Sequence, residues 1–226
     1  MNQKKGVILW DIDGTIISPV RKNIKSPHFN TVVKHGIKPN MKSKSLIGST
    51  DYEVLVELTN NYDGINKLLM LRKCFKDLDQ ESLMVYDKEA FELCLGISEA
   101  LIETKKLGWD NGVLTGNTDK RLSAKISNYL VSFNSDLFFG CKFGDSREKI
   151  TERASEMLKS KGLNRVLIVG DTPRDISVAK KFDFQVVSVA TGKFSVEELK
   201  KFKPNLVIRN FKEDLDKFLK FIDNFE

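Results

Sequence analysis

The chain has 226 residues, 41% of them hydrophobic and 30% charged, and it carries a formal net charge of +6 at pH 7. This composition is that of an ordinary soluble globular protein, and no apolar run approaches the roughly 20 residues that a membrane span requires. The lysines are spread along the whole chain and the three cysteines are widely spaced. We therefore expect a cytoplasmic protein without a disulfide framework, a zinc site or a nucleic-acid interface.

The first predicted element is a strand over Val7–Trp10, because four apolar residues follow one another without alternation. Such a run is typical of a strand that is buried on both faces of a parallel sheet. Asp11 and Asp13 follow directly, at the end of the strand where open α/β sheets place their ligands. Two carboxylates this close repel each other unless a cation or a shared proton stabilises them. The segment therefore favours a metal-assisted site, the alternative being an ordinary polar turn.

The segment 18–89 has helical periodicity and no convincing strand alternation, so we predict an all-helical insert there. One helix is expected around Phe29–Ile37, and a second begins at Thr50, where Thr50-x-x-Glu53 forms a plausible capping box. A third helix is expected to bury a stripe made of Ile65, Leu68, Leu69, Arg72 and Phe75. The predicted division is a core domain of residues 1–17 and 90–226 and a helical cap domain of residues 18–89.

Strands and helices alternate from about Gly96 onward. The predicted strands cover residues 112–115, 136–140, 166–169, 185–189 and 206–208. Such alternation implies right-handed crossovers and a doubly wound parallel Rossmann-like sheet, hence an α/β fold. Because the carboxyl ends of parallel strands lie along one edge, Asp11, Thr115 and Asp171 should converge there.

The segment 11–15, DIDGT, resembles the first motif of the haloacid dehalogenase superfamily, in particular its phosphatase branch with a helical cap, such as phosphoglycolate phosphatases. Three later segments match in the expected order: Thr115-Gly116-Asn117, the basic cluster around Arg147, and residues 170–175, GDTPRD. In that family, a helical insert between the first two motifs closes over the site and helps to select the substrate.

The resemblance implies a Mg²⁺-dependent phosphatase that hydrolyses a small phosphorylated metabolite through an aspartyl-phosphate. Asp11 would bind the metal and attack phosphorus, while Asp13 would bind the metal through its backbone carbonyl and act as general acid and base. Asp171 would complete the metal shell. Asp175 would be a further ligand or would orient one, and a plain helix cap is an equally good interpretation of that residue.

The remaining motif residues would bind the phosphate. Thr115 offers a hydroxyl and Gly116 an unhindered N–H at the start of a helix, where anions are favoured. Asn117 fits the same role or that of a turn residue. The cation that balances the transferring phosphoryl group is expected to be Arg147, which stands just before a helix, with Lys149 as the alternative; Lys142 is interpreted as a surface charge.

Two other functions remain open. A phosphomutase would use the same residues, and a binding protein could have kept the fold without catalysis, although no required carboxylate is missing. A separate feature is that residues 15–49 contain no Asp or Glu. Their basic residues are Arg21, Lys22, Lys25, His28, Lys34, His35, Lys38, Lys42 and Lys44. This stretch is either a solvated face or a region that attracts a substrate with negative charge beyond its phosphate.

Overall fold

The computed structural model of the chain describes residues 6–20, 26–40, 46–86 and 90–224. Six strands of this part form one sheet in the order β5-β4-β1-β6-β7-β8, and all neighbours run parallel. Their bounds are Gly6–Trp10 for β1, Trp109–Leu114 for β4, Phe138–Phe139 for β5, Val166–Gly170 for β6, Gln185–Val189 for β7 and Leu206–Ile208 for β8. The predicted doubly wound sheet is thereby confirmed. The direction of winding reverses between β1 and β6, where such folds bind ligands.

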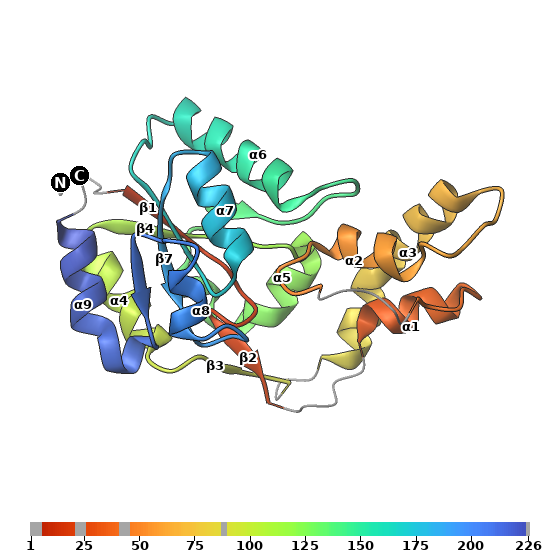
Figure 1. Cartoon of the computed structure of the whole chain (residues 1–226), viewed down its shortest axis with the longest axis horizontal. Helices are drawn as coiled ribbons and strands as arrows, with labels where there is room; N and C mark the ends of the chain where they lie inside the picture. Colours follow the sequence, from red (N-terminus) through yellow and green to blue (C-terminus); the bar gives the residue numbers. More distant parts are fainter. Residues whose placement is uncertain (1–5, 21–25, 41–45, 87–89, 225–226) are drawn as a thin grey trace.

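Helices cover both faces of the sheet (Figure 1). One face carries α4 (Ile97–Lys106), α5 (Asp119–Ile126) and α9 (Phe211–Asp223). The other carries α6 (Arg147–Ser160), α7 (Pro173–Lys181) and α8 (Val196–Lys200). Two short 3₁₀ helices, η1 (Ser127–Ser132) and η2 (Ser135–Leu137), link α5 to β5.

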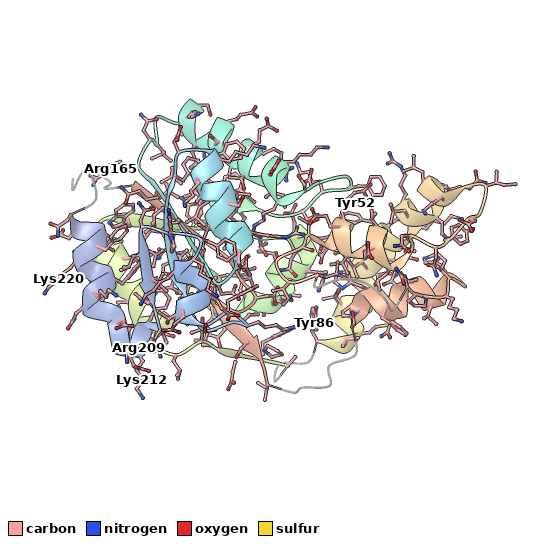
Figure 2. The ribbon with its side chains drawn as sticks, viewed as in Figure 1. Tyr52, Tyr86, Arg165, Arg209, Lys212 and Lys220 are labelled. Atoms are coloured by element: carbon pink, nitrogen blue, oxygen red, sulfur yellow. The ribbon has the colours of Figure 1, made fainter. Side chains whose placement is uncertain are left out.

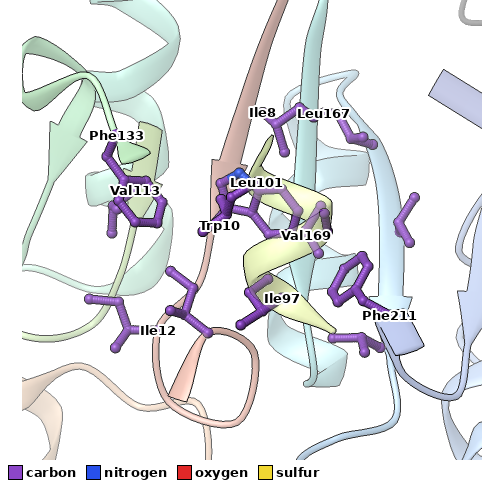
Figure 3. Packing of buried hydrophobic residues seen from close by; sticks show 14 of the residues in the cluster. Ile8, Trp10, Ile12, Ile97, Leu101, Val113, Phe133, Leu167, Val169 and Phe211 are labelled. Atoms are coloured by element: carbon purple, nitrogen blue, oxygen red, sulfur yellow. The ribbon is translucent and has the colours of Figure 1, made fainter. Parts of the chain in front are cut away.

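The first strand is buried on both sides, which explains its unbroken apolar sequence. Ile8 and Trp10 pack into the cluster on the α4 and α9 side, whereas Val7 and Leu9 pack into the cluster on the α6 and α7 side. Figure 3 shows Trp10 in the first cluster, where its ring lies 5.5 Å from that of Phe211. Its indole N–H also donates to the Asn111 side chain at 3.0 Å. These contacts fix the strand that ends at Asp11.

Three helices, α1 (Pro27–Lys34), α2 (Asp51–Leu58) and α3 (Lys67–Val85), lie to one side of the sheet and share a small core of their own (Figure 1). The capping box at Thr50 and Glu53 is present. The predicted buried stripe of α3 is wrong, because Ile65, Leu68 and Leu69 are exposed. The helix instead buries Leu71, Cys74 and Leu78 against α1 and α2. None of the described helices is long and apolar enough to cross a membrane.

A second, antiparallel sheet formed by β2 (Ile17–Pro19) and β3 (Phe91–Leu93) was not predicted. These strands have three residues each, too few for an alternation to be recognised. Residues 18 and 19, assigned to the all-helical insert, therefore belong to a strand. In chain order, β2 lies between β1 and α1, and β3 lies between α3 and α4, so the pair connects the large sheet with the helical insert. The domain boundaries themselves stay a prediction, and residues 87–89 lie outside the described part.

Candidate active site

The loops that follow the strands of the large sheet meet the α1–α2 connection around a cleft of about 530 Å³. Seven residues predicted to act at the site line it: Asp11, Asp13, Thr115, Gly116, Asn117, Arg147 and Asp171. Four strand ends thus contribute to one place, as expected for the carboxyl edge of a parallel sheet. Lys142 and Lys149 are exposed outside the cleft, and the Lys149 ammonium donates to the Gly144 carbonyl at 3.2 Å.

A buried acidic cluster lies at the bottom of the cleft. Carboxylate oxygens of Asp11, Asp171 and Asp175 lie within 4.8 Å of one another. Burial, reinforced by the neighbouring carboxylates, raises the pKa of Asp171 to about 9. Burial also raises the pKa of Asp11 to about 7, although the charge of Arg147 opposes the shift. When all three carboxylates are ionised, one guanidinium leaves two negative charges unbalanced, and hard oxygen donors with this charge fit Mg²⁺.

Asp175 is occupied by protein contacts. Its Oδ2 accepts from the Thr172 backbone N–H at 3.1 Å and from the Thr172 hydroxyl at 2.6 Å. Its Oδ1 accepts from Arg147. The helix α7 begins at Pro173 with Thr172 as N-cap, so Asp175 completes a capping box at the third helical position. The geometry therefore favours Asp175 as the residue that orients Arg147, and leaves Asp11 and Asp171 as the carboxylates open to a metal.

Arg147 is the first residue of α6 and its side chain is only 6% exposed. A guanidinium nitrogen donates to Asp11 Oδ1 at 2.9 Å, while the Nε of the same group has no hydrogen-bond partner among the described residues. Arg147 is thus held beside the acidic cluster with one buried donor that no described residue satisfies. The first position of the helix thus directs Arg147 inward, whereas Lys149, two residues later, is exposed.

Asp13 also lines the cleft and is held by Asn117 and Lys125. Asn117 Nδ2 donates to Asp13 Oδ2 at 2.7 Å and to Thr115 Oγ1 at 2.8 Å. Burial tends to raise the pKa of Asp13, but the charge of Lys125 and the hydrogen bonds of Asn117 and Lys125 outweigh it and hold the pKa below its ordinary value. Sequence reasoning missed Lys125, although its place on the buried stripe of α5, three residues after Leu122, is unusual for a lysine.

The wall opposite the sheet comes from residues 46–49 and from His28, Asp51 and Val54. Asp51 connects the helical insert to the core, because its carboxylate accepts from Arg121, from the Thr118 backbone N–H at 2.8 Å and from His28 at 2.9 Å. Burial, with the charge of Arg121, lowers the pKa of His28. Tyr86, labelled in Figure 2, accepts a hydrogen bond from Arg121 at 2.6 Å.

The basic stretch of residues 15–49 contributes little charge to this wall in the described part of the chain. His28 lines the cleft, but Lys34 pairs with Glu81 at 2.8 Å and His35 contacts Asp77 at 3.0 Å. Lys38 is exposed away from the cleft. Five of the basic residues lie outside the described residues: Arg21, Lys22, Lys25, Lys42 and Lys44.

A family model matches most of the chain. Residues 8–189 match the family model of the haloacid dehalogenase-like hydrolases. The chain belongs to this family. The hydrolase is also 30% identical over 227 residues to a protein of Caldanaerobacter subterraneus subsp. tengcongensis named "Putative pyrophosphatase PpaX", and the match covers 95% of this chain and 93% of that protein.

Solved structures share the fold of this haloacid dehalogenase-like hydrolase. A predicted phosphatase from Clostridium acetobutylicum has a TM-score of 0.70 and 17% identity, covering 97% of this chain and 100% of that one. A predicted phosphoglycolate phosphatase from Haemophilus somnus has a TM-score of 0.66 and 18% identity, covering 97% of this chain and 99% of that one. At such identities the likeness supports the α/β fold with its helical insert and no particular substrate.

Proposed function

We propose that this hydrolase is a Mg²⁺-dependent phosphatase that cleaves a small phosphorylated metabolite through an aspartyl-phosphate on Asp11. One observation carries the proposal. The Asp11 carboxylate shares a cleft with the Asp171 carboxylate and with the buried Arg147 guanidinium. The same cleft contains Asp13, whose carboxylate is paired with Lys125. These are the parts that phosphoryl transfer to a carboxylate requires: a nucleophile, charge compensation and a proton donor.

Asp11, Asp171 and the backbone carbonyl of Asp13 would hold the metal. Bound there, Mg²⁺ supplies the positive charge that lets an anionic carboxylate approach an anionic phosphate and that stabilises the transferring oxygens. Arg147 adds a fixed positive charge 2.9 Å from Asp11 Oδ1. Asp175 keeps that guanidinium in place.

Thr115 is prepared to donate to a phosphate oxygen. Its hydroxyl oxygen accepts from the Asn117 backbone N–H at 3.3 Å and from Asn117 Nδ2 at 2.8 Å, which leaves the hydroxyl proton available. Gly116 offers its N–H at the same turn. A side chain at Gly116 would approach the Ser49 carbonyl to 2.8 Å, so glycine also lets the insert pack against this turn. In this scheme Asn117 orients Thr115 and Asp13.

The reaction would proceed in two balanced steps. In the first, an Asp11 oxygen forms a bond to phosphorus, the bond from phosphorus to the ester oxygen breaks, and Asp13 gives its proton to that oxygen. In the second, the Asp13 carboxylate takes a proton from water, the water oxygen bonds to phosphorus, and the bond to Asp11 breaks. Inorganic phosphate and the original carboxylate are the products.

The test is hydrolysis of para-nitrophenyl phosphate with Mg²⁺ and with EDTA, comparing wild type with Asp11→Asn. Turnover should need Mg²⁺ and should fall at least roughly 10³-fold in Asp11→Asn. Asp63→Asn, an exposed change in the helical insert, is the matched control and should keep full activity. Near-normal turnover by a folded Asp11→Asn protein would contradict the covalent mechanism. Absence of turnover by wild type on a panel of phosphorylated metabolites would favour a binding protein without catalysis. Phosphoryl transfer between metabolites without release of phosphate would favour a phosphomutase.

We also propose that the substrate carries negative charge beyond the hydrolysed phosphate. Lys193 lines the cleft from the loop after β7, is exposed, and makes no ion pair with a described carboxylate. The name of the relative PpaX refers to pyrophosphate, a substrate of this kind. The dependence of kcat/KM on ionic strength should be steeper for pyrophosphate than for an alkyl phosphate, and Lys193→Met should reduce the difference. Equal salt dependence for both substrates would contradict this extension.

A further inference from the structure

Lys125 is a buried lysine whose ammonium lies within the active-site cleft. Its side chain is 5% exposed, and it reaches from the last turn of α5 to Asp13, 112 residues earlier in the chain. The ammonium also lies 5.7 Å from the centre of the Tyr86 ring and 5.5 Å from that of Phe91. A desolvated lysine is rarely tolerated unless its charge is paired, so this position calls for an explanation.

All three donors of the ammonium are used by protein acceptors. They reach Asp13 Oδ1 at 2.6 Å, Asp13 Oδ2 at 2.7 Å and Asn117 Oδ1 at 2.8 Å. Because a lysine has three N–H groups and no acceptor, none remains for a substrate oxygen. Lys125 is thus poorly arranged to bind phosphate, in contrast to Arg147, which has an unused buried donor.

The two oxygens of Asp13 are not equivalent in this arrangement. Oδ2 accepts from both Lys125 and Asn117, whereas Oδ1 accepts from Lys125 alone among the described residues. The Asp13 side chain remains 48% exposed, although that of Lys125 is covered. The contacts from one side therefore fix the rotation of the carboxylate and leave Oδ1 with acceptor capacity on the side of the cleft.

We propose that Lys125 is a positioning residue that holds the Asp13 carboxylate with Oδ1 directed at the leaving group and the attacking water. The inference rests on the proposed function, in which Asp13 moves these protons. Oδ1 carries the proton that passes to the ester oxygen as its bond to phosphorus breaks, and it later accepts the proton of the water. Without Lys125, only the Asn117 bond at Oδ2 restrains the carboxylate, and Oδ1 is free to rotate away.

The experiment compares para-nitrophenyl phosphate, whose leaving group departs without a proton, with phenyl phosphate, whose leaving group is more basic and similar in shape. Lys125→Met keeps the packing against Tyr86 and Phe91 and removes the ammonium. We expect kcat/KM for phenyl phosphate, which does not include hydrolysis of the aspartyl-phosphate, to fall at least about tenfold more than kcat/KM for para-nitrophenyl phosphate, within the roughly 10²–10⁴-fold typical of acid–base catalysis. Lys120→Met, on the exposed side of α5, is the control and should affect neither. Lys125→Arg should recover part of the loss.

Equal losses of kcat/KM on the two substrates, or a rise in KM with kcat unchanged, would overturn the positioning role. Should Lys125→Met fail to fold, Lys125→Gln, which retains N–H donors without the charge, takes its place in the same comparison. Asp11→Asn is measured in parallel. If Asp11→Asn still turns over para-nitrophenyl phosphate, the proposed function fails. If Asp11→Asn is inactive and Lys125→Met loses both activities equally, the Lys125 inference fails alone.

Discussion

The contact between the helical insert and the core depends on a buried ion pair that can be broken by one substitution, Asp51→Asn. The side chains of Asp51 and Arg121 are 6% and 4% exposed, and Arg121 already has one unsatisfied donor, its Nε. The substitution removes the charge that compensates this guanidinium and leaves the guanidinium buried. Breaking a buried pair on one side typically lowers the free energy of unfolding by about 3–5 kcal/mol. For a chain of this size that corresponds to a decrease in Tm of roughly 6–20 °C.

The matched control is Arg174→Gln, which breaks an exposed pair between the same two parts of the chain. Arg174 donates to Glu53 at 2.8 Å, and the two side chains are 43% and 31% exposed. Solvent screens such a pair, so the expected decrease in the free energy of unfolding is about 0–1 kcal/mol. Thermal unfolding followed by circular dichroism would measure both variants. A Tm of Asp51→Asn within error of that of Arg174→Gln would refute the argument from burial.

The pH dependence of this difference is a second check on the same pair. Burial opposes ionisation of Asp51, but the charge of Arg121 and the hydrogen bond of His28 outweigh it and hold the pKa of Asp51 well below its ordinary value. A carboxylate whose pKa is lowered on folding stabilises the protein fully above its unfolded pKa, about 3.9, and progressively less as the pH falls below it. The difference in Tm between wild type and Asp51→Asn should therefore be constant near neutrality and shrink below about pH 4.

Three further predictions concern the metal and the packing. Mg²⁺ at a hundredfold its Kd should raise the free energy of unfolding of wild type by about 2.7 kcal/mol, and calorimetry should find no such effect in Asp171→Asn. Gly192→Ala places a methyl carbon 1.7 Å from Asp171 Oδ2, so the Asp171 carboxylate must move and Mg²⁺ binding should weaken in titrations. In urea unfolding, Leu78→Ala should lower the free energy of unfolding by about 2–5 kcal/mol, because Leu78 is buried, and Leu69→Ala should lower it by less than about 0.5 kcal/mol, because Leu69 is exposed. Equal effects of the two substitutions would contradict the assignment of the buried face of α3.

Sequence reasoning was most successful where one physical rule decides the outcome. Asp11, Thr115 and Asp171 each follow an apolar strand, and parallel strands bring their carboxyl ends to one edge, so their convergence could be predicted without knowing any side-chain contact. The capping box at Thr50 was equally predictable, because the bonding groups are three residues apart.

The predictions were wrong or incomplete where packing between distant segments decides which residues are buried or paired. The helix α3 has apolar residues on more than one face, and only its contacts with α1 and α2 select the face with Leu71 and Leu78. The strands β2 and β3 pair across more than 70 residues of intervening chain, and neither has a pattern of its own. Lys125 could have been suspected from its place on an apolar stripe, but its partner depends on how α5 packs beside the loop after β1.

The distribution of charge around the cleft explains why these distant contacts matter for chemistry. Five buried or cleft-lining carboxylates, Asp11, Asp13, Asp51, Asp171 and Asp175, face three cations, Arg121, Lys125 and Arg147. Arg121 pairs with Asp51, Lys125 with Asp13 and Arg147 with both Asp11 and Asp175, so two negative charges remain at the acidic cluster when all five carboxylates are ionised. A divalent cation there would neutralise the cleft before a substrate enters. The phosphate would then meet no net repulsion, and the exposed Lys193 at the entrance would remain available for any further negative charge that the substrate carries.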